Sequence, residues 1–249
     1  MLLRLLPPAA VALAGVVLGQ LLQPLASHAA PSLQALETAL NDPAPTALAA
    51  VLESGQGLDL MELEQRRTAL RQRFPDAHWR VQPGAVLRDG RPSVEVVVTG
   101  SESQGATRFR LEAHQQLLLG ASGSRFNSQE VLRESAILRS GPEDLRLSLQ
   151  IPDAVLTGQR YDLDVVFDDP LEGGVIAGAI KPVSAADLLQ FRSPDLPLEA
   201  LGGGGLFKSV QAPYQPGSQT WAVLLVHPRG VVAASKRVRV VADRQNLQL

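Results

Sequence analysis

Apolar residues recur every three or four positions between residues 32 and 74, which is the period of an amphipathic helix. Ser32 is placed to cap a first helix, a second short helix fits residues 46–53, and a third is expected to begin after Asp59. We expect these helices to lie on a sheet. One face of the third helix carries four apolar side chains interrupted by an arginine: Leu60, Leu63, Leu70 and Phe74, with Arg67 among them.

From His78 the apolar period changes to two, which is typical of strands with one buried face. Asp89-Gly90 is a strong signal for a hairpin turn. The segment after residue 124 alternates as a strand would, although EVLRES within it also suits a helix; a strand is favoured because it completes a sheet. The expected strands cover residues 85–88, 93–99, 107–119 and 125–139, with a loop over residues 100–105.

Helices followed by an antiparallel sheet of about four strands are the layout of cystatin-like and nuclear-transport-factor-2-like (NTF2-like) α+β folds. Such folds often form a cone whose mouth holds a small apolar ligand. The residues expected to line this cavity are Val94, Val96, Phe109 and Leu111. The alternative is that they pack on the helices and leave no cavity. The opposite face of the strand over residues 107–119 is interpreted as solvated, and it carries Arg108, Arg110, Glu112 and His114.

Ser140-Gly141-Pro142 has the composition of a domain boundary. Beyond it, short alternating segments are separated by turn residues, and about 100 residues of this kind predict an immunoglobulin-like β-sandwich. The predicted fold is therefore an α+β helix-on-sheet domain over residues 31–141, followed by an all-β sandwich over residues 142–249. Its expected strands cover residues 145–151, 161–167, 174–181, 206–211, 220–226 and 231–241, with Trp221 in the core.

Residues 202–209 read GGGGLFKS, which comes close to the phosphate-binding pattern G-x-x-x-x-G-K-[ST]. Phe207 replaces the second glycine. A phosphate loop must also precede a helix, and Pro213 and Pro216 exclude a helix here. No nucleotide site is therefore expected.

The glycines end a long irregular connection over residues 192–205, and loops of that length are often functional. They restrict the backbone little and deliver Leu206 and Phe207 to the start of a strand. Either this pair turns into the sandwich core, or it stays partly exposed as a tip that faces a partner. The candidate partner-facing loop consists of Gly202, Gly203, Gly204, Gly205, Leu206 and Phe207.

The first 30 residues have the tripartite pattern of a secretory signal peptide: Arg4, an apolar run over residues 9–19, and small residues at Ser27 and Ala29. Gln20 follows too soon for a membrane-spanning helix of about 20 apolar residues. We expect residues 1–30 to be a cleaved signal peptide of an exported protein. An uncleaved membrane anchor is the alternative.

The composition argues against several kinds of binding and catalytic site. The chain has 249 residues, a formal net charge of −2 and no cysteine, so nucleic-acid binding, thiol catalysis and cysteine zinc sites are not expected. The histidines lack metal-type spacing, and no G-x-S-x-G motif occurs. Calcium binding by the acidic residues 162–172 stays open, although ion pairs across strands with Arg237 and Arg239 are a simpler use. No catalytic residue, cofactor or metal site is predicted.

The stretches FPDAHWRVQPG, ESAILRSG, IPDAVLTGQRYDLDVVFDDPL, GGLFKSVQAP and QTWAVLLVHPRG carry a resemblance that would span most of the mature chain. In these stretches the chain is similar to a family of exported cyanobacterial proteins of unknown function. The resemblance implies a photosynthetic bacterium, with the periplasm or the thylakoid lumen as the destination. It implies no activity, so no catalytic residue can be carried over.

These patterns predict an exported, non-enzymatic module that binds a protein or an envelope component. One alternative is a carrier of a small apolar or lipid ligand in the N-terminal domain. A second is a hydrolase, because catalytic groups can assemble in space from distant positions.

Overall fold

The computed structural model describes residues 31–141, 145–167, 176–184, 187, 194–201 and 205–247. The expected signal peptide therefore lies outside the described residues. Within them, no helix has the length and apolar character that crossing a membrane requires. The helices are α1 (Leu33–Asn41) and α2 (Leu60–Arg73), with short 3-10 helices η1 (Leu48–Ala50) and η2 (Arg244–Asn246).

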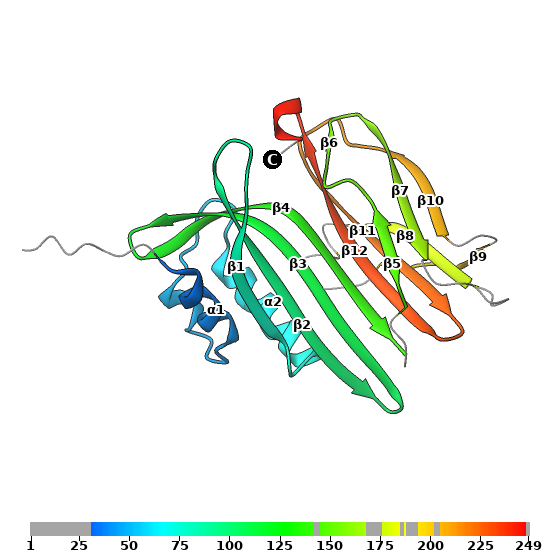
Figure 1. The fold of residues 1–249 in the computed structure, drawn as a ribbon, viewed down its shortest axis with the longest axis horizontal. Coiled ribbons are helices and arrows are strands. Elements are labelled where there is room, and N and C mark those ends of the chain that lie inside the picture. The colour runs from blue at the N-terminus through cyan, green and yellow to red at the C-terminus, as the bar shows by residue number, and fades with distance from the viewer. Residues whose placement is uncertain are drawn as a thin grey trace, which may run out of the picture.

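The fold consists mainly of strands arranged in two sheets (Figure 1). Among the described residues, one sheet has the order β1-β2-β3-β4-β12-β11-β8-β9, with β6 beside β12, and a smaller one has the order β10-β7-β5. The strands are β1 (His78–Val86), β2 (Pro92–Gln104), β3 (Thr107–Ser122), β4 (Arg125–Ser140), β5 (Leu147–Gln150), β6 (Ala154–Leu156), β7 (Arg160–Phe167), β8 (Ile176–Val183), β9 (Glu199–Leu201), β10 (Gly205–Gln211), β11 (Gly217–His227) and β12 (Gly230–Val241).

The large sheet runs through the expected domain boundary. β4, from the first half of the chain, pairs antiparallel with β12, from the second half. The pairing extends from Arg139 opposite Val232 to Glu134 opposite Arg237. The sheet under the helices and the larger sheet of the sandwich are therefore one continuous sheet.

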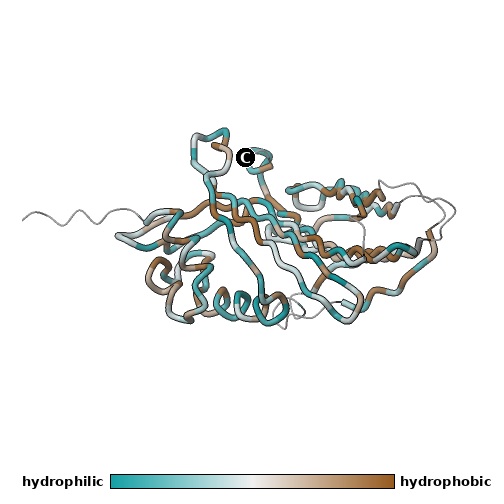
Figure 2. The backbone as a smooth tube through the Cα atoms, turned by 60° about the horizontal axis from the view of Figure 1, so that its bottom comes forward, coloured by the Kyte–Doolittle hydropathy of each residue, from teal (hydrophilic) through white to brown (hydrophobic). Residues whose placement is uncertain are grey.

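Two hydrophobic cores lie on opposite faces of this sheet. Leu138 packs against the core under the helices, whereas its neighbour Ile137 packs against the core of the sandwich. Consecutive side chains of a strand point to opposite faces. The helices thus cover one face of the first half, and β10-β7-β5 covers the other face of the second half. Figure 2 shows apolar segments, in brown, along the strands of both halves.

Local signals in the helical segment predict its ends well. The Ser32 hydroxyl accepts the Ala35 N–H at 3.0 Å, and the Asp59 carboxylate accepts the Glu62 N–H at 3.0 Å. Both are the capping bonds expected from the sequence. The expected short helix over residues 46–53 forms only as the single turn η1.

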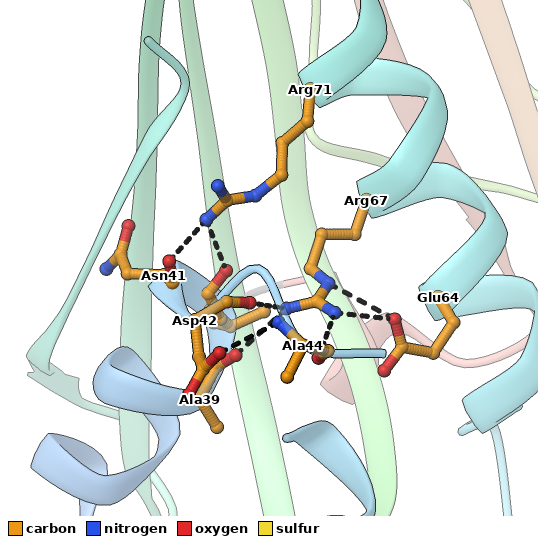
Figure 3. Close-up of polar contacts among 8 residues, drawn as sticks. Ala39, Asn41, Asp42, Ala44, Glu64, Arg67 and Arg71 are labelled. Atoms are coloured by element: carbon orange, nitrogen blue, oxygen red, sulfur yellow. Dashed lines mark hydrogen bonds and ion pairs between the residues drawn. The ribbon is translucent and has the colours of Figure 1, made fainter. Parts of the chain in front are cut away.

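The arginine that interrupts the apolar face of α2 is buried and holds α1 in place (Figure 3). The Arg67 guanidinium donates to the carbonyl oxygens of Ala39, Asp42 and Ala44, and it pairs with Glu64 at 2.9 Å. The neighbouring Arg71 donates to the Asn41 carbonyl at 2.6 Å. These bonds satisfy carbonyls at the C-terminus of α1, which have no partner within the helix, and carbonyls in the segment that follows it.

Strand β1 is an edge of the large sheet, and side chains of α1 cover part of its backbone. Asn41 accepts the Trp79 N–H at 3.0 Å and donates to the Trp79 carbonyl at 2.7 Å. Glu37 accepts the Val81 N–H at 2.7 Å. Side-chain partners thus replace the missing neighbouring strand over this stretch.

Three expectations about strands are corrected. The loop expected over residues 100–105 is mostly strand, because β2 and β3 pair as far as Gln104 opposite Thr107 and turn tightly at Gly105, where φ is +60°. The short strands β6 and β9 were not expected. β6 pairs parallel with β12, and β9 pairs with β8 inside the connection expected to be irregular.

Candidate functional site

Strand β10 holds the described part of the candidate partner-facing loop. Gly205, Leu206 and Phe207 open the strand, whereas residues 202–204 lie outside the described residues. Leu206 packs against the sandwich core, and Phe207 leaves 69% of its surface exposed. Leu206 therefore turns into the core, as the first alternative requires, and Phe207 is exposed, as the second requires.

The pairing of β10 with β7 explains this division. Leu206 lies opposite Val165, which is fully buried, and Phe207 lies opposite Asp164 on the outer face. The Phe207 ring also leans over Gly205, because a Cβ built on that glycine would lie 3.1 Å from the ring atom Cζ. An aromatic side chain that covers a glycine on an edge strand is a known stabilising arrangement.

β10 is also an edge strand. Within the described residues it pairs with β7, and the sheet order β10-β7-β5 places it at one end. Half of the backbone N–H and C=O groups of such a strand point away from its partner, which makes them available to another extended chain. Exposed aromatic surface and unpaired backbone therefore meet at the same strand.

Lys208 is not in a phosphate-binding geometry. Residues 205–211 pair with β7 along their whole length, so their backbone cannot wrap around a phosphate. The Lys208 ammonium lies 5.8 Å from the centroid of the Trp221 ring. Trp221 is buried, as expected, and donates to the Tyr161 hydroxyl at 2.9 Å, which donates to Gln219 at 2.7 Å. Burial raises the pKa of the Tyr161 phenol and keeps it a donor.

The residues expected to line a ligand cavity lie against the helices. Val94 and Val96 are 7% and 6% exposed and belong to the core cluster that includes α1, and Phe109 and Leu111 pack at its margin. Two concavities in the described part of the chain have volumes of about 540 and 320 Å³. Leu111 contributes to the larger one, and the other three line neither. Their contacts match the alternative in which these residues pack on the helices and leave no cavity between them.

The larger concavity lies beside the sandwich on the sheet face opposite the helices, and we call it the arginine groove. The sequence placed Arg108 and Arg110 on a solvated face but did not single out Arg139 or Arg146. Strand register, which short-range patterns do not encode, places Arg110 opposite Arg139, and Arg146 lines the same groove from the segment before β5. The groove is lined by Asp76, Thr99, Gly100, Ser101, Arg108, Arg110, Leu111, Glu112, Arg139 and Arg146.

One rim of the arginine groove is fixed by Asp76. Its carboxylate accepts the Ser101 hydroxyl at 2.5 Å and the Ser101 N–H at 2.6 Å. These bonds, the hydroxyl first, lower the pKa of Asp76, and the charge of Arg108 lowers it further. Asp76 therefore carries a negative charge at neutral pH.

The described residues offer no cluster of three or more His, Asp or Glu side chains suited to a metal ion. Of the acidic stretch considered for calcium, Asp162 and Asp164 lie on β7, and residues 168–172 lie outside the described residues. The cross-strand pairs considered for them are not formed. Arg237 instead lies 3.5 Å from Glu134, and Arg239 lies 3.8 Å from Glu130.

His227 is the one buried histidine in the described part of the chain. Its ring stacks on Phe167 with centroids 5.1 Å apart, and Nδ1 accepts the Arg229 N–H at 3.1 Å. These contacts hold the turn between β11 and β12. They give His227 a structural explanation without any catalytic partner being required.

Residues 142–241 match a known family model. The model describes a domain of unknown function, DUF8623. No curated protein matches the chain. The match begins at the predicted domain boundary and includes all of β10, so the exposed Phe207 lies within the part of the chain that is similar to this family. The arginine groove draws Arg146 from the matched range and its other lining residues from the preceding half.

Proposed function

We propose that the chain is an exported, non-enzymatic binding module that takes up an extended segment of a partner polypeptide along β10. The observation that carries the proposal is the exposed Phe207 on an edge strand. An added strand would form main-chain hydrogen bonds with β10 and pack a side chain against the Phe207 ring. Aromatic residues are prominent among the anchors of protein interfaces.

Charges beside β10 suggest the chemistry of this segment. Asp164 lies opposite Phe207, and Asp162 lies opposite Ser209 on the same outer face. A partner strand paired with β10 would match this surface if it placed an apolar residue beside Phe207. On the same face it would carry a lysine or arginine whose long side chain reaches across β10 toward Asp164 or Asp162.

A second copy of the chain fits the edge less well. Lys208 is the middle residue of β10, so an antiparallel pair of β10 strands centred on it would bring two ammonium groups opposite each other. Like charges opposite each other destabilise a strand pair. We therefore assign the edge to a different polypeptide.

Peptide selection tests this function. A display library of random 12-residue peptides is selected on the purified chain, and affinities are measured for the wild type and for Phe207→Ala and Val86→Ala. Val86 has the same 69% exposure on another edge strand, which makes it a matched control. We expect Phe207→Ala to weaken binding at least about tenfold and Val86→Ala to leave it unchanged. Equal affinities for the two variants would refute the assignment.

The finer fold assignments belong to the same proposal. Packing of β10-β7-β5 onto the large sheet around one core supports an immunoglobulin-like sandwich, and helices on the first half support a cystatin-like or NTF2-like arrangement. The lipid-carrier alternative stays a prediction, which native mass spectrometry of the purified chain would check. The hydrolase alternative gains no observation in its favour.

A further inference from the structure

Lys208 is the inward-facing residue at the middle of β10. Its neighbours along the same face, Leu206 and Val210, pack against the sandwich core, and side chains two residues apart in a strand share a face. The Lys208 ammonium follows them inward, since it lies 5.8 Å from the centroid of the buried Trp221 ring on β11. A positive charge therefore stands on the inner face of β10, at the edge of the sandwich.

This charge makes pairing with β10 costly for an apolar strand. Among the described residues, the ammonium faces the Trp221 ring and forms no ion pair with a carboxylate. Lys208 is exposed while β10 is the end of its sheet. A strand added beside β10 would cover it, and an ammonium removed from water is costly unless a carboxylate pairs with it. Inward-pointing charges on edge strands discourage pairing with unsuitable chains in this way.

Hydrogen bonding to β7 shows which partner residue would meet Lys208. The Ala212 N–H, just past the end of β10, donates to the Gln159 carbonyl at 2.8 Å. Because backbone groups alternate in direction along a strand, Lys208 also turns its N–H and C=O toward β7, and Phe207 and Ser209 turn theirs outward. An antiparallel partner would bond to Phe207 and Ser209. Its residue opposite Lys208 would occupy a non-hydrogen-bonded position, where side chains of paired strands come closest.

We propose, on the basis of the binding function assigned to β10, that Lys208 selects partner segments that carry an aspartate or glutamate opposite it. Partner residues two positions to either side would point inward toward Leu206 and Val210, so apolar side chains fit there. The inner face of the bound segment then reads apolar, acidic, apolar at every second residue. Its acidic residue distinguishes this segment from uniformly apolar strands, which would leave the Lys208 charge without a partner.

Parallel selections test this role of Lys208. The library of random 12-residue peptides is selected on the wild type, on Lys208→Glu and on Lys208→Met, each checked for folding by thermal unfolding. We expect an acidic residue at one fixed place in the apolar motif of wild-type peptides and a basic residue at that place for Lys208→Glu. Lys208→Met keeps the apolar stem and should show no charge preference. Arg80→Glu reverses an exposed charge on edge strand β1 and should select the same peptides as the wild type.

Affinities of matched peptides give the size of the effect. Replacing the selected acid by the corresponding amide should weaken binding to the wild type about two- to fivefold. Replacing the acid by lysine should give a peptide that binds Lys208→Glu more tightly than it binds the wild type. This reversal between peptide and protein isolates the pair from other effects of each change.

The outcomes separate the role of Lys208 from the function of β10. Peptides that need Phe207 but whose charge preference ignores position 208, or also changes in Arg80→Glu, would overturn the role of Lys208 and leave the binding function intact. Because the selections use the full chain, neutralisation of Lys208 by a carboxylate of residues 168–172 would give this same negative result. The absence of any Phe207-dependent peptide would instead refute the binding function, and the role of Lys208 with it.

Discussion

Arg67 shows how one buried charge organises the helical layer. Arg67 is 4% exposed, and its guanidinium is bonded to three carbonyls and one carboxylate. A buried charge is tolerated only when such partners replace water. In the sequence, Arg67 only interrupts an apolar face. Its role depends on carbonyls at and after the end of α1, and these are too far away in the chain for a local pattern to predict the contact.

Replacement of Arg67 by methionine should strongly destabilise the fold. The variant leaves Glu64 and the carbonyls near the end of α1 without their donor, so we expect a loss of about 3–5 kcal/mol. Arg66→Met is the matched control, because Arg66 makes an exposed pair with Glu62 and its loss should cost less than about 1 kcal/mol. Urea unfolding measures both, and similar losses would contradict the role given to Arg67.

Asp76 should give stability a dependence on acid pH. Hydrogen bonds from Ser101 hold the pKa of the folded carboxyl below its usual value. Its contribution is therefore present above the unfolded pKa of about 3.9 and is lost as the pH falls through the folded pKa. Asp76→Asn should lose less stability than the wild type between pH 5 and 2, by under about 1 kcal/mol because the group is exposed. Identical pH profiles in urea unfolding would argue against it.

The two edge strands β1 and β10 are treated differently by the rest of the chain. Asn41 and Glu37 bond to the outward backbone of β1, whereas β10 presents Phe207 beside an unpaired edge in the described structure. Covered edges resist unwanted pairing. The fold covers the edge at β1 with side chains, and it leaves the described edge at β10 uncovered. This contrast supports a role for β10 in binding another chain.

Asn41→Ala should uncover β1. The variant removes both bonds to Trp79, and we expect a loss of about 1–2 kcal/mol together with a greater tendency to self-associate. Unfolding curves and light scattering measure the two effects. Thr38→Ala on the same helix serves as control, because the Thr38 hydroxyl bonds within α1 to the Gln34 carbonyl. A stable and monomeric Asn41→Ala variant would show that the cap is dispensable.

The sequence predicts individual elements better than their partners, for physical reasons. Caps at Ser32 and Asp59 and the alternation in β3 depend on neighbouring residues and are confirmed. The pairing of β4 with β12 joins residues far apart in the chain, and alternation does not say which strand lies beside which. The arginine groove depends on the same register, so the sequence pattern indicates only some of the residues that line it. The exposure of Phe207 follows from its pairing with β7, and the sequence of the glycine loop does not predict that pairing.

The molecule as a whole is organised by the continuous sheet. Besides the β4–β12 pairing, ion pairs cross between the halves: Arg133 pairs with Asp153, and Glu134 pairs with Arg237. Backbone pairing and charges thus link the two cores at one seam. A shared sheet differs in kind from the polar surface contacts that usually join independent domains.

This seam should make unfolding cooperative across the predicted boundary. We expect one transition in calorimetry of the chain from residue 31 onward, with the two cores melting together. Residues 31–141 expressed separately should be markedly less stable, because β4 then loses its partner β12. Two separate transitions, or a fragment as stable as the whole, would contradict a single unit.

Photo-cross-linking from position 207 tests partner binding at β10 most directly. p-Benzoylphenylalanine replaces Phe207 in one variant and the equally exposed Val86 in another, in cells that produce the full chain. We predict a covalent adduct from position 207 whose cross-linked residues fall within one short segment of one protein, and no such adduct from position 86. A synthetic peptide of that segment should bind the wild type and not Phe207→Ala. No adduct from position 207, or the same adducts from both positions, would contradict the assignment of β10 as the binding edge.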